Sequence, residues 1–463
     1  MFNAIAKATK SVFSWNSNQY DAVNPSTKRR NSGYDVKSSD RALGTTERRQ
    51  LIESGRDINR NFAAGAYMIR KHLDYVSTFS FQPRTGDAKL DADLSSLFKW
   101  WSRPENCDVA GRHSLASMIR LAESHRTIDG DVFLLKLKSG HLQGIESDRV
   151  MNEGGTGIVQ DSPVSKAVRQ VHGIHVDNGG RAIAYDVYTK GIYMSYQYDR
   201  TVKAQNMLHH GYFDGFDQIR GVSPLASAIP TFIDTLEMKE YARLKAKISQ
   251  LFALSIQRQA AMYEDESCGT TEYNVDFGKG PVMLDLDPGD EANFLESKTP
   301  ATEFQDFITM SLQIASKALD IPWSFFDESF TNYSGSRIAM LQYVKSAQSK
   351  REQNQCLLDK ITRWKLAQWQ QEGLLPMIPL RNIQWSWIPS GTPWFDVKNE
   401  AEADIMLIQN GLKTRREVRQ ERYGDDWSTV IDELKAEQEK MAILTPAQPQ
   451  QPQQEQAPNE QAE

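Results

Sequence analysis

The amino-acid sequence predicts an α+β protein whose second half is dominated by long helices. Two observations predict this class. Residues 131–140 and 173–188 alternate apolar and polar side chains as strands do, and Asp177-Asn178-Gly179-Gly180 is a plausible hairpin turn. From Ser223 an apolar stripe continues at helical spacing for about 30 residues. With 463 residues, the chain is long enough for two or three domains.

The first part of the chain is predicted to be a flexible segment followed by helices and strands. Residues 1–45 are polar and rich in Ser, Asn, Lys and Arg, so we expect them to be flexible. A helical pattern covers residues 46–76, with Gly55 and Gly65 as candidate breaks that would divide it in two. Residues 113–130 form another amphipathic pattern, which Gly130 is expected to end.

The long helix has a well-marked start in the segment FDGFDQIRGVSPLASAI, residues 213–229. Aspartates and glycines crowd a turn at 214–221. The hydroxyl of Ser223 can then accept from free backbone N–H groups, and Pro224 suits the first helical position. We expect this helix at 223–254, and it carries no recognisable reactive group.

The remainder alternates helices with turn-rich segments. Residues 255–298 are acidic and turn-rich, and a second helix is expected at 299–321, where Ile321-Pro322 stops it. A loop at 322–336 precedes a third long helix, whose polar middle predicts that it crosses a solvated or tightly controlled space between packed regions. Short helices are expected at 396–445, and the Pro/Gln-rich residues 446–463 are expected to be disordered.

Composition disfavours several classes of protein. A net charge of −6 and a pI near 5.9 argue against a protein that mainly grips nucleic acid, since phosphate neutralisation needs basic residues. No apolar run approaches the ~20 residues of a membrane span, and MFNAIAKATKSVFSW lacks the apolar core of a secretory signal. Cys107, Cys268 and Cys356 are too widely spaced for a disulfide framework, so we expect free, buried thiols and a cytoplasmic setting.

The sequence nominates no catalytic residue, cofactor or metal, so we expect the protein not to be an enzyme. It lacks the P-loop and nucleophile-elbow motifs. The clustered histidines, His172 with His175 and His209 with His210, are more typical of polar or core residues than of metal ligands. The acidic segment DLDPGDE lacks the spacing of a calcium loop.

Four segments, in this order, resemble the portal proteins of tailed bacteriophages of the lambda type. They are RQLIESGRDINRNFAAGAYMIRKHLDYV, FDGFDQIRGVSPLASAIPTFIDTLEMKEYARLKAKI, YSGSRIAMLQYVKSAQSKREQ and WIPSGTPWFDVKNEAEADIMLIQNGLKTRREVRQERYGDDW. The resemblance covers residues 45–435 and leaves both terminal stretches outside.

The resemblance implies a portal fold, α+β in class, assembled as a ring that is usually a dodecamer. The ring is expected at one vertex of the capsid. Mapped onto this chain, it implies the following regions: a flexible segment at 1–45, an α+β wing at 46–222, a first stem helix at 223–254, a small α/β clip at 255–298, a second stem helix at 299–321, a tunnel loop at 322–336, a long helix and return to the wing at 337–395, crown-like helices at 396–445 and a disordered tail at 446–463.

In function, the resemblance implies a channel through which viral double-stranded DNA is packaged by a separate terminase motor and later ejected. The expected partners are further copies of the chain, the terminase large subunit, the major capsid or scaffolding protein, a head–tail connector protein and the DNA, with no membrane. Assembly is expected in the host cytoplasm and the final location in the virion. The absence of a P-loop agrees with a motor on another chain.

The same mapping suggests candidate site residues. The tunnel-loop residues expected nearest the DNA are Thr331, Asn332, Tyr333 and Ser334. Lys317 and Arg337 flank this loop and could damp the repulsion between phosphates and an acidic wall, and solvated or paired surface charges are an equally good interpretation. The candidate docking surface for terminase is the acidic clip: Glu264, Asp265, Glu266, Asp285 and Asp287.

Two other classes of function stay open from the sequence. The first is a ring-shaped structural adaptor of the head that does not contact DNA. Loss of packaging with intact head assembly in tunnel-loop variants would separate it from a portal. The second is an unrecognised hydrolase, such as a nuclease that uses carboxylate-bound Mg²⁺.

Overall fold

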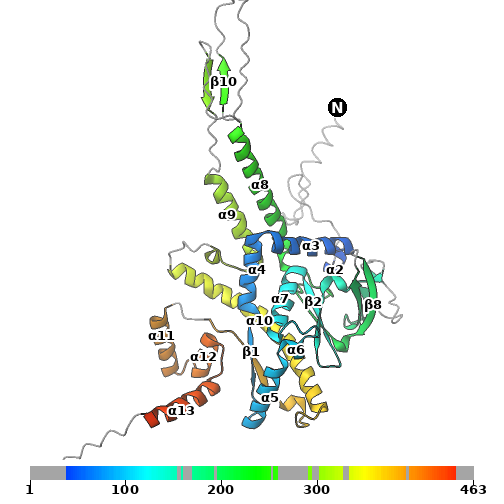
Figure 1. Ribbon diagram of the computed structural model, residues 1–463, viewed down its shortest axis with the longest axis vertical. Helices are drawn as coiled ribbons and strands as arrows, with labels where there is room; N and C mark the ends of the chain where they lie inside the picture. Colours follow the sequence, from blue (N-terminus) through cyan, green and yellow to red (C-terminus); the bar gives the residue numbers. More distant parts are fainter. Residues whose placement is uncertain are drawn as a thin grey trace, which may run out of the picture.

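The chain folds into an α+β body that carries an arm of two helices at one end and a group of C-terminal helices at the other (Figure 1). This arrangement confirms the predicted α+β class. The computed structural model describes residues 38–153, 158–159, 169–191, 195–251, 254–258, 290–294, 302–326, 333–392 and 396–444.

The first helical run divides in two, but not at its glycines. The helices of this part are α2 (Ser39–Ala42), α3 (Thr45–Asn61), α4 (Ala63–Val76), α5 (Ala88–Trp101), α6 (Pro104–Cys107) and α7 (Leu115–Asp129). The break between α3 and α4 falls at Phe62, whose backbone is extended, so the predicted breaks are wrong. Gly55 and Gly65 are instead points of close contact. A Cβ at Gly55 would lie 2.9 Å from the carbonyl oxygen of Ile128, and one at Gly65 would collide with the side chain of Ile58.

Helix α7 has the boundaries that its sequence predicts. The Ser114 hydroxyl accepts a hydrogen bond from the N–H of Ser117 at its start. Gly130, with φ of +96°, ends it in a conformation that favours glycine. The chain then enters the central strand of a sheet directly, which brings the end of α7 next to that strand.

Two antiparallel sheets follow α7. The three-stranded sheet has the order β3-β2-β9 and the five-stranded sheet the order β4-β5-β6-β7-β8. The predicted hairpin is confirmed between β6 and β7, where the Asp177 carboxylate accepts from the N–H groups of Gly179 and Arg181. The strands are β2 (Asp131–Lys136), β3 (Leu142–Glu146), β4 (Ile158–Val159), β5 (Arg169–Val171), β6 (Ile174–Val176), β7 (Ala182–Lys190), β8 (Tyr196–Lys203) and β9 (Met207–Gly211), with the 3₁₀ turns η2 (Ser147–Arg149) and η4 (Ala204–Asn206).

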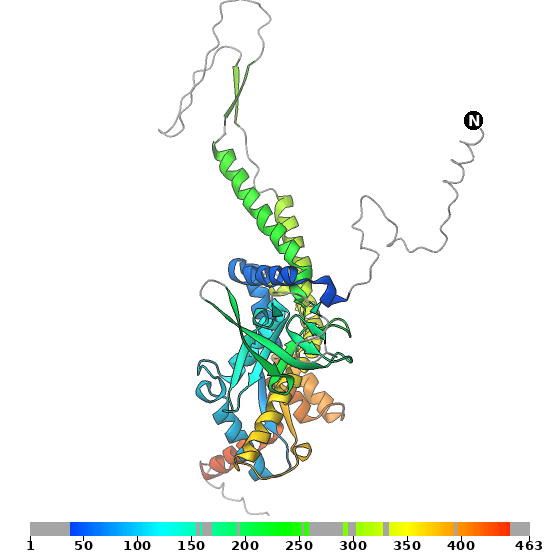
Figure 2. The same cartoon turned by 90° about the vertical axis from the view of Figure 1, so that its right-hand side faces the viewer.

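The arm leaves the body as one helix and returns as another, side by side with the first in both views (Figures 1 and 2). Its parts are η5 (Pro224–Ser227), α8 (Ile229–Leu251), β10 (Leu254–Arg258), β11 (Asp290–Phe294), α9 (Thr302–Ser316) and η7 (Lys317–Leu319). The predicted start at Ser223 is confirmed as a capped 3₁₀ turn, and regular α-helix begins at Ile229. Strands β10 and β11 pair antiparallel at the far end.

The third long helix, α10 (Tyr333–Gln371), crosses the whole body and leads the chain back to its beginning. The short turn η8 (Trp323–Phe325) precedes α10. After this helix, the turn η9 (Leu380–Asn382) leads to strand β12 (Trp385–Pro389), which pairs antiparallel with β1 (Phe79–Pro83). The C-terminal helices are α11 (Val397–Gln409), α12 (Arg415–Tyr423) and α13 (Trp427–Leu444). The last of these is longer than the short helices that the sequence predicts.

The polar middle of α10 lies within the body instead of crossing solvent. Arg351 Nε donates to the carbonyl of Tyr75 (2.6 Å), and Asn354 Nδ2 donates to the carbonyl of Val76 (3.3 Å). These carbonyls end α4, where unpaired oxygens and the negative end of the helix dipole favour a cationic or amide donor. The polar residues of α10 therefore cap another helix.

Three apolar clusters form the core. One joins α5, α10 and β12 through aromatic contacts, such as Phe98 with Trp369 at 4.9 Å between ring centroids. A second joins α4 to the roots of both arm helices and includes Phe232 and Leu319. The third lies between the two sheets. Since the second cluster holds both α8 and the end of α9, the arm is rooted in the body on both of its legs.

The cysteines correct one expectation. Cys107 is buried, as expected, whereas Cys356 is exposed on α10, so the prediction of a buried thiol is wrong there. Cys268 lies outside the described residues. Among the described helices, no stretch combines the length and hydropathy needed to cross a membrane.

Candidate functional site

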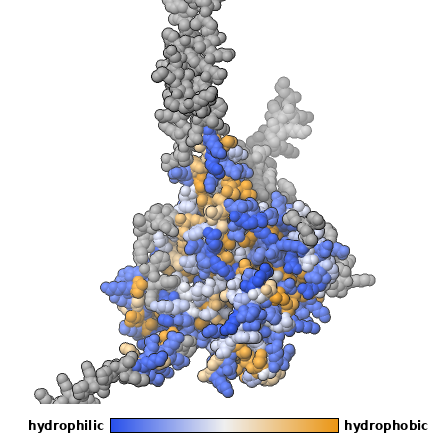
Figure 3. Space-filling model, viewed as in Figure 1, coloured by the Kyte–Doolittle hydropathy of each residue, from blue (hydrophilic) through white to orange (hydrophobic). Residues whose placement is uncertain are grey.

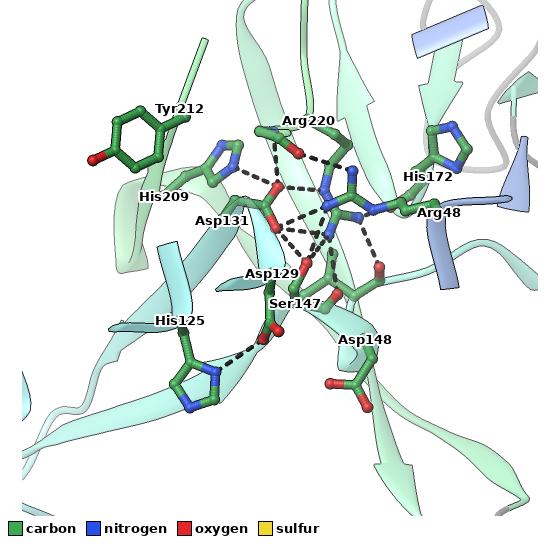
Figure 4. A network of polar contacts seen from close by, with 12 residues as sticks. Arg48, His125, Asp129, Asp131, Ser147, Asp148, His172, His209, Tyr212 and Arg220 are labelled. Atoms are coloured by element: carbon green, nitrogen blue, oxygen red, sulfur yellow. Dashed lines mark hydrogen bonds and ion pairs between the residues drawn. The ribbon is translucent and has the colours of Figure 1, made fainter. Parts of the chain in front are cut away.

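The chain enters the arm through residues 212–223, here called the anchor loop, which a buried ion network fastens to the body (Figure 4). At the centre is the carboxylate of Asp131 on β2, which is 0% exposed. Arg220 of the anchor loop donates to it from Nε (2.7 Å) and Nη2 (3.1 Å), and Arg48 of α3 donates from Nη2 (3.0 Å). One carboxylate therefore holds the anchor loop, a strand and a helix together.

The remaining donors of Arg220 are also used. Nη1 donates to the carbonyls of Val150 and His172, at 2.8 and 2.5 Å, and Nη2 donates to the carbonyl of Ser147 at 3.0 Å. Burial would raise the pKa of Asp131, but the guanidinium groups of Arg220 and Arg48 hold that pKa well below its usual range. Asp131 is thus a charged group whose partners fill its hydrogen-bonding capacity.

Two glycines and a serine complete the root of the first arm helix. A Cβ on Gly221 would collide with the carbonyl oxygen of Gly130, so the anchor loop can pass the end of α7 only with glycine at both positions. The Ser223 hydroxyl donates to the carbonyl of Thr127 (2.6 Å) and accepts from the N–H of Leu225 (3.1 Å). Its single side chain both caps η5 and ties it to α7.

A second buried network reaches α10. Glu123 of α7 is 0% exposed; its carboxylate lies 3.0 Å from His72 Nε2 and 3.0 Å from Arg126 Nε, and it accepts from the Tyr212 hydroxyl (3.2 Å). Burial would raise the pKa of Glu123, but Arg126 and the neighbouring histidines lower it well below the usual range. His210 lies 3.7 Å from the same carboxylate.

Strand β9 joins the two networks through adjacent histidines. His209 Nε2 lies 3.3 Å from Asp131, and His210 Nε2 lies 2.9 Å from the Asn354 side chain of α10. Because neighbouring residues of a strand point to opposite faces, one dipeptide contacts the anchor loop's network on one face and α10 on the other. Burial lowers the pKa of both histidines.

The clustered histidines are thus held by protein groups. His175 Nε2 lies 2.8 Å from Asp186, and His172 Nε2 lies 3.3 Å from the carbonyl of Asp40. Within the described residues no group of His, Cys, Asp and Glu side chains has a geometry that could hold a metal ion. The site offers no assembled nucleophile and base either, and its ordered polar groups bind one another.

The arm exposes apolar side chains in stripes. On α9, Phe307, Met310 and Ile314 lie within about 60° of one another around the helix axis, and Met310 is 50% exposed. The buried Ala315 and Leu319 lie on a different side of this leg and face the body. Figure 3 shows apolar surface gathered where the arm leaves the body.

Helix α8 has a matching stripe. Ile233, Tyr241 and Leu244 lie within about 80° around the axis and are all exposed, whereas Phe232 is buried in the body. A single chain leaves both stripes in water. A surface helix normally has one apolar face, so a second face on each helix indicates that something else packs there.

The return leg of the arm ends on an aromatic platform formed by Tyr67, Tyr75, Trp323, Phe325, Phe326 and Tyr343. The rings of Tyr75 and Phe325 stack at 5.7 Å, and the Tyr67 hydroxyl donates to the carbonyl of Phe325 (2.6 Å). Beside the platform, Lys350 Nζ of α10 donates to Asp320 (3.0 Å), which has φ of +62°. These contacts fix the point from which the predicted tunnel loop starts.

The residues predicted nearest the DNA are only partly described. Helix α10 begins at Tyr333, so Tyr333 and Ser334 lie in its first turn, and the predicted loop boundary at 336 is wrong by four residues. Local helix formation by the polar YSGS segment was not apparent from its sequence. Thr331 and Asn332 lie outside the described residues.

The predicted flanking charges differ in their surroundings. Lys317 is exposed on η7. Arg337 Nη2 forms an ion pair with Glu400 of α11 (3.2 Å). The clip residues Glu264, Asp265, Glu266, Asp285 and Asp287 lie outside the described residues.

Comparison with known proteins gives one family. The model of the family described as phage portal protein, lambda family, matches residues 27–351. No curated protein matches the chain. A solved structure titled neck of an empty GTA particle, computed with C6 symmetry, has a TM-score of 0.47 and 13% identity and covers 79% of this chain and 92% of its own. The virion of a native gene transfer agent (GTA) particle has a TM-score of 0.44 and 15% identity, covering 81% and 92%.

Proposed function

The chain belongs to the lambda family of phage portal proteins, and we propose that it is the subunit of a portal ring at the unique vertex of a capsid. In this proposal the ring is a dodecamer and surrounds a channel. Viral double-stranded DNA passes inward through the channel during packaging by a separate terminase, and outward during ejection.

The observation that carries the proposal is the second apolar stripe on each arm helix. Fully burying one such side chain stabilises a contact by about 1.5–3 kcal/mol, so six of them are a substantial driving force for association. If the stripe of α8 packs against the stripe of α9 in the next copy, every arm has a neighbour on both sides. Such head-to-tail contacts close into a ring when the rotation allows.

The arm then forms the wall of the channel, and its exposed polar face points to the lumen or to solvent. Exposed charges on α8 carry both signs, for example Glu237 and Lys239. At −6 per chain, twelve copies sum to −72 (12 × −6), and a mostly acidic ring repels phosphates rather than binding them. Weak contact suits a channel through which DNA must slide.

The residues beyond the arm take the other roles in this proposal. Thr331, Asn332, Tyr333 and Ser334 come nearest to the DNA, with Lys317 and Arg337 beside them. The acidic segment that contains Glu264, Asp265, Glu266, Asp285 and Asp287 docks the terminase, and head–tail connector proteins later bind at the same end. The C-terminal helices face the capsid or scaffolding protein. No step of bond chemistry is assigned to this chain.

Native mass spectrometry with negative-stain imaging of the same sample tests the ring. A dodecamer weighs about 631 kDa (12 × 52.6 kDa) and shows a central hole. Met310→Glu places a charge in the α9 stripe and is expected to abolish the ring. Gln305→Glu adds the same charge to an exposed position of α9 outside the stripe and is expected to leave the ring intact. A wild-type chain that stays monomeric at high concentration contradicts the proposal.

DNA passage is tested separately from ring formation. Replacing Thr331, Asn332 and Ser334 together by glutamate adds charge where the DNA is proposed to pass, and packaging in an infected cell is expected to fail while heads with portal rings still assemble. A head that packages normally with this variant would favour the adaptor function, in which the ring never contacts DNA.

A further inference from the structure

The anchor loop holds one aromatic side chain entirely in solvent. Phe216, at the tip of the loop, has a relative exposure of 111%. The loop beneath it is well ordered by Gln218, which is 8% exposed. The side-chain oxygen of Gln218 accepts from the N–H of Asp214 (2.9 Å), and its nitrogen donates to the carbonyl of Arg220 (2.8 Å). A fixed backbone that presents a bare phenyl ring loses little entropy on binding, as at interface hot spots.

The surroundings of Phe216 define what it can bind. Asp214 and Asp217 are exposed on either side of it, so the tip is apolar with a negative rim. Phe213, by contrast, packs edge-on against His209 at 5.4 Å and belongs to the body. A complementary site is an apolar recess, of the size of an aromatic ring or larger, with a positive charge at its mouth.

The chain itself has such a recess. A cavity of about 430 Å³ lies between β1, α5 and α7, and its walls include Phe79, Phe98 and Trp387. Lys99 also lines it, is exposed, and has no ion-pair partner among the residues that the structure describes. Aromatic walls accommodate an inserted ring edge-on, a geometry that adds to the gain from burial.

The tip and the cavity lie on opposite sides of the body. The anchor loop is bound to α2, because the Asp40 carboxylate accepts from the N–H groups of Ile219 (2.7 Å) and Arg220 (3.1 Å). Figure 2 shows α2, in dark blue, at the right of the body and α5, in paler blue, at its lower left. The tip cannot fill the cavity of its own chain in this arrangement. Two different complementary surfaces on opposite sides are what a head-to-tail contact requires.

We propose that Phe216 of one copy inserts into the β1–α5–α7 cavity of the next copy, with Asp214 and Asp217 facing the neighbour's Lys99 side chain. This contact rests on the ring proposed above and adds to it an attachment within the body, separate from the stripes of the arm. It gives each subunit a second contact with its neighbour, far from the channel wall.

Photo-crosslinking in the full-length protein tests the contact. Phe216 is replaced by p-benzoylphenylalanine, and rings are assembled from a mixture of ¹⁴N- and ¹⁵N-labelled copies. After irradiation, mass spectrometry is expected to find adducts between a light and a heavy copy at the segments that line the cavity, namely residues 77–119, Leu358 or Trp387. The same cross-linker at Tyr198, which is exposed on β8, is the matched control and is expected to give no adduct in these segments.

A charge exchange provides a second measurement that does not depend on the cross-linker. Asp217→Lys and Lys99→Glu each place like charges together, and each is expected to speed subunit exchange between rings by about tenfold or more. The double variant restores the attraction and is expected to return exchange to within about threefold of wild type. All these positions are exposed, so folding is not at risk.

The outcomes separate this contact from the ring itself. Rings that form normally but give adducts within one copy, or outside the cavity-lining segments (residues 77–119, Leu358 and Trp387), overturn the Phe216 contact and leave the portal function standing. Rings in which both single variants exchange at the wild-type rate also overturn it. A chain that forms no ring at all overturns the proposed function, and this contact with it.

Discussion

Replacing Arg220 by methionine should loosen the root of the arm without unfolding the rest of the body. Arg220 is 1% exposed and donates to Asp131 and to three backbone carbonyls. Breaking a buried ion pair by removing one partner costs about 3–5 kcal/mol. Asp131 keeps Arg48 and the N–H of Gly221 (3.0 Å), so we expect the lower end of that range.

Hydrogen exchange measured by mass spectrometry reports this loss locally. A decrease of about 3 kcal/mol in the free energy of opening corresponds to about 150-fold faster exchange, because each 1.4 kcal/mol is a factor of ten. The increase is expected in peptides that cover residues 219–228, and strands β7 and β8 are expected to keep their protection. The wild type and the Arg220→Met variant are compared as intact rings at the same pH.

A matched substitution of a surface arginine distinguishes the loss of the buried network from a general effect of removing a positive charge. Arg200 on β8 is half-exposed and lies 3.4 Å from its neighbour Asp199. Arg200→Met is expected to change exchange in its own peptide by less than about fivefold, since exposed pairs contribute at most about 1 kcal/mol. Arg220→Met with protection at residues 219–228 within threefold of wild type would refute the role given to the buried network.

Three further predictions concern packing, pH and thiol reactivity. Gly221→Ala should lower the free energy of urea unfolding by several kcal/mol, about 3 or more, because its Cβ meets a facing carbonyl. Gly144→Ala, whose Cβ meets nothing within 4 Å, should be neutral within about 1 kcal/mol. Equal effects of the two substitutions would contradict the close approach. Acidification from pH 7 to 5 should lower the free energy of unfolding, because burial lowers the pKa of His210. Near the ordinary pKa of histidine, the unfolded chain binds a proton that the folded chain does not, so the free energy of unfolding rises with pH in this range. His210→Asn should flatten this slope, and an unchanged slope would exclude His210 as a contributor. A thiol reagent should modify Cys356 within minutes and leave Cys107, whose pKa burial raises to about 12, unmodified until the protein unfolds; peptide mapping distinguishes the two.

Features that depend on neighbouring residues could be predicted from the sequence. Ser223 and Pro224 mark a helix start through chemistry that acts over two or three residues, and the hairpin at Asp177 is set by its own turn. The end of α7 at Gly130 is local as well. In each case the residue acts on backbone groups within one turn of itself, so no knowledge of the rest of the fold is needed.

Features that depend on distant partners could not be predicted from the sequence. Arg220 is central to the root of the arm, but its carboxylate partner lies 89 positions away, and Arg126 is equally buried, so burial alone does not identify it either. The single signal near it is an Arg-Gly pair just before a capped helix start, which is too common to be specific. Gly55 resembled a helix break because the close contact with Ile128 is tertiary. The roles of the tunnel-loop and clip residues are implied by the family alone.

The pairing of β1 with β12 has a consequence for the order of events during synthesis. Phe79 lies opposite Pro389, which is 310 residues later in the chain (389 − 79). At about 5–20 residues per second, roughly 15–60 s separate the emergence of the two strands from the ribosome. Throughout this interval β1 lacks its only strand partner among the described residues, and the Phe81 ring lacks Trp387, which it contacts at 5.1 Å in the finished protein. The pairing of β1 with β12 therefore forms only after both helices of the arm have been made, and β1 stays without this partner until then.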